Sequence, residues 1–286
     1  MKKILITGKK SYVGTSVKKW LEDYSGEYLI DSISLRNESW KEIDYSNYDV
    51  VFHVAGIAHI KETEKNADLY YRVNRDLAYK TAEKAKNEGV KQFIFLSSMS
   101  VYGIQSGVID KNSALNPQSN YGKSKLEAEG LISSLIDDQF KVAIIRPPMI
   151  YGKECKGNYV RLAKLAKKVP VFPNINNNRS MLYIDNLSEF VRLLIEDCTC
   201  GLFFPQNEKY ICTSEMVKLI AEEHGKKIRM TNLFNPFIKV FRTATLTKIF
   251  GDLVYEETMS RFKESYIVKT YKESLKETES RGYGEL

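Results

Sequence analysis

The chain opens with MKKILITGKKSYVG, which runs from Met1 to Gly14. The apolar run over residues 4–6 predicts a buried strand, and the segment that follows has the periodicity of an amphipathic helix. A strand, a glycine turn and a helix in this order can bind a dinucleotide, because N–H groups at the helix start face the pyrophosphate. Gly8 permits the tight turn and Gly14 permits close packing of helix on strand, while Ser11 replaces the usual middle glycine. The predicted cofactor contacts of this segment are Gly8, Lys10, Ser11, Tyr12, Val13 and Gly14.

Short apolar runs and amphipathic segments alternate along the rest of the chain. We predict strands over residues 3–7, 29–35, 50–54, 92–96, 142–146 and 201–204, and helices over residues 13–23, 67–88, 119–136 and 184–196. This alternation is typical of an α/β fold in which helices cover both faces of a parallel, doubly wound sheet. Beyond residue 154 the pattern changes. Helices are predicted over 158–167 and 214–224, the later chain reads as irregular, and residues 274–286 are expected to fray.

A second motif carries candidate catalytic chemistry. Tyr121 lies four residues before Lys125, which places both side chains on one face of a helix. The ammonium group can then lower the pKa of the phenol from its usual value of about 10. The hydroxyl of Ser98, brought beside the phenol, would complete a proton-transfer site. The spacing Y-x-x-x-K carries little information alone. It becomes informative because of its position in the sequence relative to the N-terminal glycine turn.

Further motifs occur between and after these two: Val54-Ala55-Gly56, Asn74, Val101-Tyr102-Gly103 and Arg146 to Gly152. In this order and spacing the chain resembles the extended short-chain dehydrogenase/reductase family, or NAD-dependent epimerase/dehydratase family. The resemblance implies a Rossmann-type domain of residues 1–154, to which residues 182–213 return. It also implies a small substrate-binding domain of residues 155–181 and 214–286. Within the family, the later motifs look like the capsule-biosynthesis branch, which acts on UDP-activated amino sugars.

The choice of cofactor depends on the end of the second predicted strand. Members that prefer NAD carry an acid there, which binds the ribose 2′-hydroxyl. This strand ends in Ile33-Ser34-Leu35-Arg36, and Asp31 lies nearer its start. Arg36 suits a 2′-phosphate, and Lys10 adds positive charge. NADP(H) is therefore favoured and NAD(H) stays open. By resemblance, Asp44, Ala55, Gly56, Lys125 and Pro148 complete the cofactor site, although Asp44 reads equally well as a turn residue.

The substrate contacts follow from the resemblance. Asn158 and Arg179 match family positions that hold the diphosphate of a nucleotide sugar, and Phe172 could approach the uracil. Each has a structural alternative: a helix cap for Asn158, a solvated loop residue for Arg179, and a core aromatic for Phe172. A second phosphate-binding arginine has no clear match, since Arg242 and Arg261 are both candidates. Ser98 and Tyr121 would contact the reacting sugar.

Two reactions remain open from the sequence. As a reductase, the protein would use NADPH to reduce C4 of a UDP-4-keto-6-deoxy-N-acetylhexosamine for surface polysaccharide biosynthesis. Tyr121 would then donate the proton, Ser98 would bind the oxygen, and Lys125 would hold the ribose. As a 4-epimerase of UDP-glucose or UDP-GlcNAc, the same residues would serve both faces of the ketone with NAD retained. Dehydration is excluded because Met99 and Ser100 stand where dehydratases carry an acid pair. A non-catalytic cofactor-sensing or RNA-binding relative is a remote alternative.

Composition narrows the remaining classes. The 286 residues carry a net charge of +7, but the lysines are interleaved with acids, so nucleic acid is not an expected partner. No apolar run approaches the ~20 residues of a membrane span, and the early apolar run is too short for a signal peptide. The four cysteines and three histidines, His53, His59 and His224, lack metal-ligand spacing, and His53 reads as a core residue. We therefore expect a cytoplasmic enzyme without a metal or a membrane partner, and by analogy a homodimer.

Overall fold

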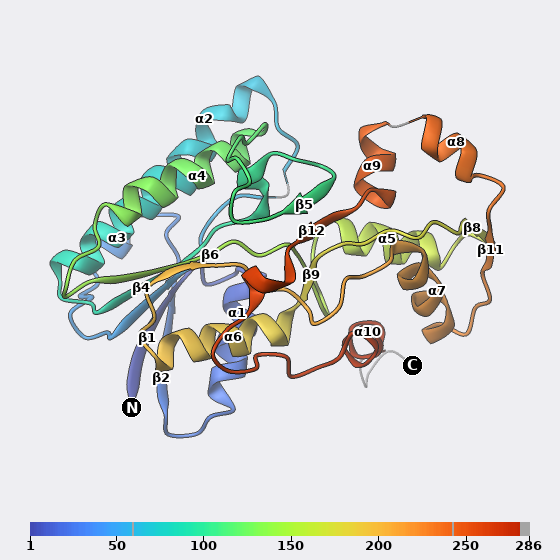
Figure 1. The fold of residues 1–286 in the computed structure, drawn as a ribbon. Coiled ribbons are helices and arrows are strands. Elements are labelled where there is room, and N and C mark those ends of the chain that lie inside the picture. The colour runs from blue at the N-terminus through green and yellow to red at the C-terminus, as the bar shows by residue number, and fades with distance from the viewer. Residues whose placement is uncertain (59, 242, 281–286) are drawn as a thin grey trace.

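The computed structural model describes residues 1–58, 60–241 and 243–280 (Figure 1). Six parallel strands form the central sheet in the order β10-β6-β4-β3-β1-β2. The strands are β1 (Lys2–Thr7), β2 (Tyr28–Ile33), β3 (Val50–His53), β4 (Gln92–Leu96), β6 (Lys141–Ile145) and β10 (Gly201–Phe203). The inner strands β1, β3, β4 and β6 are largely buried apolar runs, as expected for a sheet covered by helices on both sides, whereas the edge strands β2 and β10 are partly exposed.

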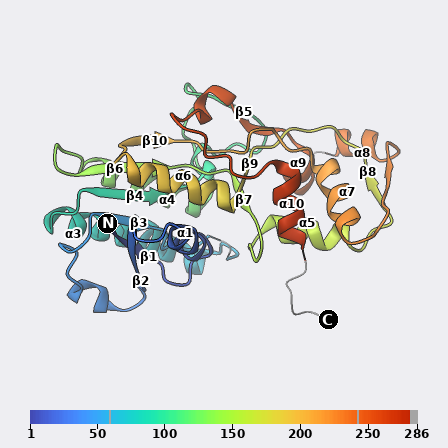
Figure 2. The same ribbon diagram turned by 90° about the horizontal axis from the view of Figure 1, so that it is seen from below.

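Helices cover the two faces of this sheet (Figures 1 and 2). On one face, α1 (Tyr12–Glu22) packs against α6 (Ile184–Glu196). On the other lie α2 (Ala67–Tyr70), a π-helical turn η3 (Tyr71–Asp76), α3 (Leu77–Asn87) and α4 (Asn120–Ser133). Two separate apolar clusters fill the spaces between the sheet and these layers. The predicted doubly wound α/β sheet is confirmed.

The strand order reverses beside β1. This strand lies between β2 and β3, so the connections leave it toward opposite sides of the sheet. In open parallel sheets the crevice outside the carboxyl ends of such neighbouring strands is where ligands bind. The loops that follow β1 and β3 are the segments predicted to hold the cofactor. The topology therefore brings two sequence-distant motifs to one crevice.

The remaining elements gather beyond the carboxyl edge of the sheet (Figures 1 and 2). Three small two-stranded pairings join distant segments, and four helices accompany them. The pairs are β5 (Gly107–Ile109) with β12 (Leu253–Tyr255), β7 (Met149–Tyr151) with β9 (Met181–Tyr183), and β8 (Val171–Pro173) with β11 (Arg229–Thr231). The helices are α5 (Asn158–Ala166), α7 (Thr213–Glu223), α8 (Asn235–Val240) and α9 (Ala244–Phe250).

The C-terminal region departs from the prediction. Residues 271–279 form helix α10 (Tyr271–Glu279), although we expected the chain to fray from residue 274. Thr270 and Glu273 form a reciprocal capping box at its start, and Ser274 and Leu275 are buried. The hydroxyl groups of Ser274 and Tyr151 lie 2.6 Å apart and tie the helix to β7. Residues 281–286 lie outside the described residues. In the part of the chain that is described, no helix has the length and apolarity that a membrane crossing requires.

Candidate active site

The predicted catalytic residues meet at the carboxyl edge of the sheet. Ser98 follows β4, and Tyr121 and Lys125 lie in the first two turns of α4. The Ser98 hydroxyl lies near the Tyr121 hydroxyl, close enough to lower the pKa of the phenol by hydrogen bonding. The Ser98 hydroxyl also lies 3.1 Å from the Ser100 hydroxyl and accepts the Ser100 N–H at 3.1 Å. The structure thus places the phenol and the serine hydroxyl together, as the sequence predicted.

Lys125 is almost fully buried beneath this pair. Its ammonium group donates to the Leu96 carbonyl at 2.8 Å and lies 4.5 Å from the centre of the Phe95 ring. Burial lowers the pKa of Lys125 to about 8, while Glu129 opposes the change. A group whose pKa lies near neutrality can change its protonation state at a reaction centre, which is a common property of active-site residues.

One electrostatic prediction is wrong. We expected Lys125 to lower the pKa of Tyr121, but burial raises that pKa and only the hydrogen bond with Ser98 opposes the rise. The reason is the direction of the lysine side chain, which reaches past the phenol to the carbonyl at the end of β4. Tyr121 is consequently a protonated phenol near neutral pH, the form that can donate a proton.

The start of α4 is fixed by two caps. The Ser119 hydroxyl accepts the Gly122 N–H at 3.0 Å. The carboxylate of Glu62, from the loop between β3 and α2, accepts the backbone N–H groups of Asn120 at 2.9 Å and Tyr121 at 3.1 Å. A carboxylate at a helix N-terminus stabilises the free N–H groups and the positive end of the helix dipole. Sequence reasoning missed Glu62, because its partners lie almost sixty residues away.

The glycine turn has the geometry that a pyrophosphate needs. Gly8 has φ of +107°, and a Cβ there would lie 3.0 Å from the Ala55 nitrogen. A Cβ on Gly14 would lie 2.9 Å from the Val54 side chain, so only glycine allows α1 to pack this closely on the sheet. Ser11 is the N-cap of α1 and accepts the Gly14 N–H at 3.4 Å. Its hydroxyl therefore performs a capping role that the missing glycine could not.

The loop after β3 is held against α4 by a buried asparagine. Asn74 donates to the Ile57 carbonyl at 3.0 Å and to the Ser124 hydroxyl at 3.2 Å, and accepts the Ile57 N–H at 2.8 Å. A Cβ on Gly56 would lie 3.0 Å from Asn74 Oδ1 and 3.6 Å from Lys125 Nζ. Ala55 and Gly56 thus lie between the glycine turn and Lys125, along the path predicted for a dinucleotide.

At the far end of this path the charges are mostly positive. Arg36 is exposed beyond the end of β2, and Lys9 and Lys10 are exposed in the glycine turn. The Gly8 and Lys9 N–H groups both donate to the Ile33 carbonyl, at 2.8 and 2.9 Å, so turn and strand end are adjacent. Asp31 lies within β2, and its carboxylate accepts a hydrogen bond from the Tyr48 hydroxyl at 2.8 Å.

Four other predicted cofactor residues occupy different surroundings. Asp44 is exposed, and its carboxylate accepts Ser46 and Asn47 groups at 2.6–3.0 Å, which is the turn role weighed above. The Tyr12 hydroxyl is buried without a hydrogen-bond partner among the described residues, and burial raises its pKa. Val13 is buried against the sheet, and Pro148 is buried beyond the end of β6.

The predicted substrate residues separate into two groups. Asn158 is exposed at the start of α5 and does not cap it, because Gly157 is the N-cap. Arg179 is half-buried, donates to the Gly251 carbonyl at 2.8 Å, and forms no ion pair within the described residues. Burial lowers its pKa and Asp252 opposes the change. Phe172, predicted as a uracil contact, instead lies in the hydrophobic core with its ring centre 5.6 Å from that of Phe250.

Other polar groups near the site are structural. Arg146 and Glu129 form a buried ion pair at 2.6 Å, and Arg146 also donates to the Tyr102 hydroxyl at 3.0 Å. His53 is fully buried between β1 and β4, as expected of a core residue, and burial lowers its pKa to about 3. Among described residues no cluster of potential metal ligands occurs. His59 and Arg242 lie outside the described residues, and Arg261 is exposed.

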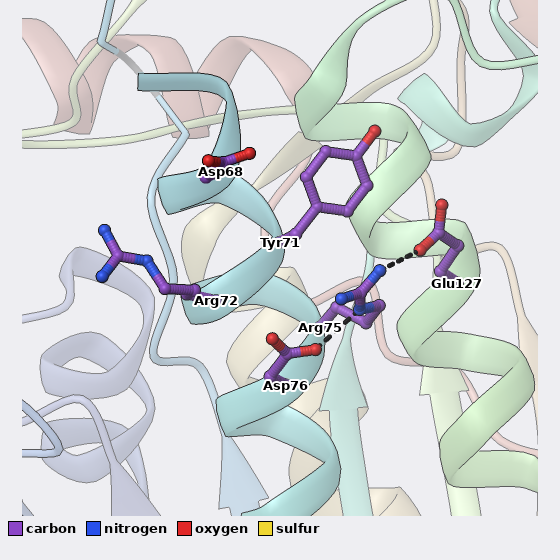
Figure 3. A pocket seen from close by; sticks show the side chains of 6 residues that line it. All are labelled: Asp68, Tyr71, Arg72, Arg75, Asp76 and Glu127. Atoms are coloured by element: carbon purple, nitrogen blue, oxygen red, sulfur yellow. Dashed lines mark hydrogen bonds and ion pairs between the residues drawn. The ribbon is translucent and has the colours of Figure 1, made fainter. Parts of the chain in front are cut away.

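A surface hollow lies on the outer side of the helices that carry this site (Figure 3). Its lining is charged, and Arg75 bridges two acids there, Asp76 and Glu127, each at 2.7 Å. The Arg75 guanidinium also lies 5.1 Å from the centre of the Tyr71 ring. The positive and negative charges that line the hollow therefore largely cancel. Ser98, Tyr121 and Lys125 are not among the residues that line it.

Comparison with known proteins agrees with this geometry. The NAD dependent epimerase/dehydratase family matches residues 4–202. A UDP-glucose 4-epimerase of Vibrio cholerae is 32% identical over 251 residues, covering 77% of this chain and 75% of the relative. An N-acetyl-α-D-glucosaminyl-diphospho-ditrans,octacis-undecaprenol 4-epimerase of Escherichia coli O157:H7 is 25% identical over 82% of this chain and 76% of the relative.

Solved structures share the fold. A dTDP-4-dehydrorhamnose reductase of Clostridium acetobutylicum superimposes with a TM-score of 0.74 and 22% identity, over 96% of this chain and 98% of the other. A UDP-glucuronic acid 4-epimerase of Bacillus cereus superimposes with a TM-score of 0.70 and 18% identity, over 97% of each chain. The chain therefore belongs to the NAD dependent epimerase/dehydratase family, whose members are extended short-chain dehydrogenases/reductases.

Proposed function

We propose that this protein is an NADP(H)-dependent 4-ketoreductase of a nucleoside-diphosphate sugar, with a UDP-4-keto-6-deoxy-N-acetylhexosamine as substrate. One observation carries the choice of cofactor: Arg36, Lys9 and Lys10 gather where NAD-preferring proteins place an acid. A 2′-phosphate is a good ligand for arginine. An enzyme that takes up NADPH and releases NADP⁺ performs net reduction, whereas an epimerase returns its cofactor unchanged.

The catalytic residues suit chemistry at C4. A bound nicotinamide would supply the hydride. Tyr121 is protonated near neutral pH and can donate its proton to the C4 oxygen as negative charge develops there. Ser98 orients the phenol and offers a second hydrogen bond to the same oxygen. Lys125 is buried beside Gly56, where it can bind a ribose hydroxyl. Its positive charge would stabilise the phenolate that Tyr121 becomes after it donates its proton.

The substrate diphosphate would bind at Arg179. This guanidinium is partly desolvated and lacks a carboxylate partner among the described residues. A bound anion would therefore offset the free-energy cost of burying its charge. Asn158 is exposed and offers an uncommitted amide at the start of α5. These contacts lie in residues 155–181 and 214–286, which we assign to a substrate-binding domain, with residues 1–154 and 182–213 forming the cofactor domain.

A 4-epimerase is the second candidate, and the relatives favour it. The Vibrio cholerae and Escherichia coli relatives are both described as 4-epimerases. The substrate named for the Escherichia coli protein is a sugar diphosphate attached to a polyprenol rather than to UDP. The same tyrosine, serine and lysine would serve an epimerase, because removing and returning hydride at C4 needs the same proton transfers.

Cofactor titration separates the two candidates before any substrate is known. The reductase proposal expects tighter binding of NADPH than of NADH, and release of the cofactor during purification. Equal or tighter binding of NADH, or NAD that copurifies with the protein, would favour the epimerase.

The setting follows from the proposed substrate. A nucleotide sugar used for surface polysaccharide is made in the cytoplasm, where reduced nicotinamide is also available. A homodimer through the outer faces of α3 and α4 belongs to the same proposal by analogy with the family. Light scattering of the purified protein would give the mass of a monomer if this part is wrong.

A further inference from the structure

An apolar face is exposed at the end of the molecule farthest from the central sheet. Helix α8 lies there, at the same end as β8 and β11 (Figures 1 and 2). The side chains of Leu233, Phe237, Val240 and Phe241 are 78%, 63%, 75% and 62% exposed. Their spacing of three or four residues places them along one side of a helix and its flanks. A soluble protein rarely exposes several large apolar side chains together unless they bind something.

The segment is anchored so that this face points away from the protein. Asn235 is half-buried, and its side-chain amide donates to the Asn174 carbonyl at 2.9 Å. Ile238, the residue after Phe237, is also half-buried. The inner side of α8 is thus occupied by the protein, and the outer apolar side has no partner among the described residues.

The charge of the surrounding segment identifies a suitable partner. Between Glu223 and Asp252 the sequence carries six lysine and arginine residues and no aspartate or glutamate. Residues 155–184, which include β8 beside β11, also carry six lysine and arginine residues and no aspartate or glutamate. Lys227, Arg229 and Lys248 are exposed on the elements that flank α8. A short apolar helix with a basic surround is the combination that lies in the interface of a membrane with anionic headgroups.

We propose that the exposed outer side of α8 and its flanks, together with Lys227, Arg229 and Lys248 (the basic apolar segment), bind the surface of an anionic phospholipid membrane, with the outer side of α8 inserted among the headgroups. A second copy of the chain fits less well, because a two-fold contact would bring two acid-free basic segments together. The proposal is independent of the sugar chemistry. It concerns a surface contact, whereas the hydropathy argument against a membrane partner concerned a crossing segment.

Vesicle flotation with the full-length protein tests this proposal. We expect binding to vesicles of phosphatidylcholine with about one-third phosphatidylglycerol, and at least about tenfold weaker binding to phosphatidylcholine alone. Binding should weaken when the salt concentration rises from about 0.05 M to about 0.5 M, because exposed charges are then screened.

Two variants and their controls locate the contact. Phe237→Asp combined with Val240→Asp should reduce binding by about tenfold or more, because it places charge on the inserted face. Val108→Asp, at a similarly exposed position on β5, should bind as wild type does. Lys227→Glu should weaken binding, and Lys19→Glu on the exposed side of α1 should not.

Several outcomes would overturn the proposal. It is wrong if wild-type protein does not float with anionic vesicles, or if the double variant floats as well as wild type. It is also wrong if the double variant changes only the mass of the protein in solution, which would identify the face as a self-association surface. A raised KM for a soluble sugar nucleotide, with vesicle binding unchanged, would instead identify a cover over the substrate.

Discussion

Glu62→Ala is the perturbation that most specifically tests how the fold positions Tyr121, the proposed proton donor. The change removes the carboxylate that accepts the backbone N–H groups of Asn120 and Tyr121 at 2.9 and 3.1 Å. Loss of a helix N-cap costs about 1 kcal/mol, within a range of about 0.5–2 kcal/mol. The Ser119 cap on Gly122 remains, so α4 should stay helical. For a chain of this size the expected fall in Tm is about 2–4 °C for each kcal/mol.

The effect on catalysis should exceed the effect on stability. Without Glu62 the first turn of α4 is less restrained, and a small displacement of a catalytic group can reduce the rate by about 100-fold. We expect kcat to fall by about tenfold or more, while the dissociation constant of the cofactor changes little, because Glu62 contacts none of the cofactor residues. Glu62→Gln keeps one acceptor oxygen and should recover part of the rate.

Ser119→Ala is the matched control. It removes a cap from the same helix, but its partner is the Gly122 N–H rather than that of Tyr121. The two alanine variants should lose similar stability in thermal unfolding followed by circular dichroism, and only Glu62→Ala should lose most of its kcat. If the two variants lose kcat equally, or if Glu62→Ala retains more than half of the wild-type value, Glu62 only stabilises the helix and the reasoning is refuted.

Four further outcomes are expected. Tyr121→Phe should lower kcat by about 10²–10⁴ with folding and cofactor affinity retained, and a rate within about threefold of wild type would remove Tyr121 from its role. Arg36→Ala should weaken NADPH by roughly 1.5–3 kcal/mol, the scale of a hydrogen bond to a charged group, and leave NADH almost unchanged in a fluorescence titration. Arg179→Ala should raise KM for the sugar nucleotide more than it lowers kcat, since a diphosphate remote from C4 is held alike in ground and transition states; an unchanged KM would contradict this. The rate should fall as pH rises through about 8, because Lys125 then loses its proton, and a pH profile that stays flat to pH ~10 would show that the ammonium form is not required.

Much of the fold was predictable because its strands are uninterrupted apolar runs. Residues 4–6 and 50–54 could only be buried, and the glycines of the first turn fixed where the helix must begin. The proximity of Tyr121 and Ser98 was also predictable. Ser98 follows the fourth strand of a parallel sheet, and Tyr121 lies at the start of the next long helix, so both reach the carboxyl edge of the sheet. The loops after β1 and β3, predicted to hold the cofactor, lie side by side because carboxyl ends of neighbouring parallel strands meet at one edge of the sheet.

The failures share a different physical cause. Helix α10 lies in a polar stretch of sequence, and what stabilises it is a capping box together with a contact to Tyr151 on a distant strand. Glu62 caps a helix that begins far along the chain, so no local pattern announces it. The pKa of Tyr121 depends on where the Lys125 side chain turns, and the direction is set by a carbonyl at the end of β4. Phe172 is buried by packing against Phe250, which no periodicity near either residue indicates.

The most direct test of the central claim follows the near-ultraviolet absorbance of NADPH while the protein acts on a UDP-4-keto-6-deoxy-N-acetylhexosamine. The account predicts loss of one NADPH for each sugar reduced, with formation of a UDP-6-deoxy sugar that carries a hydroxyl at C4, and no loss with Tyr121→Phe. Interconversion of UDP-GlcNAc with UDP-GalNAc, or of UDP-glucose with UDP-galactose, without net consumption of NADPH would contradict the reductase and establish the epimerase.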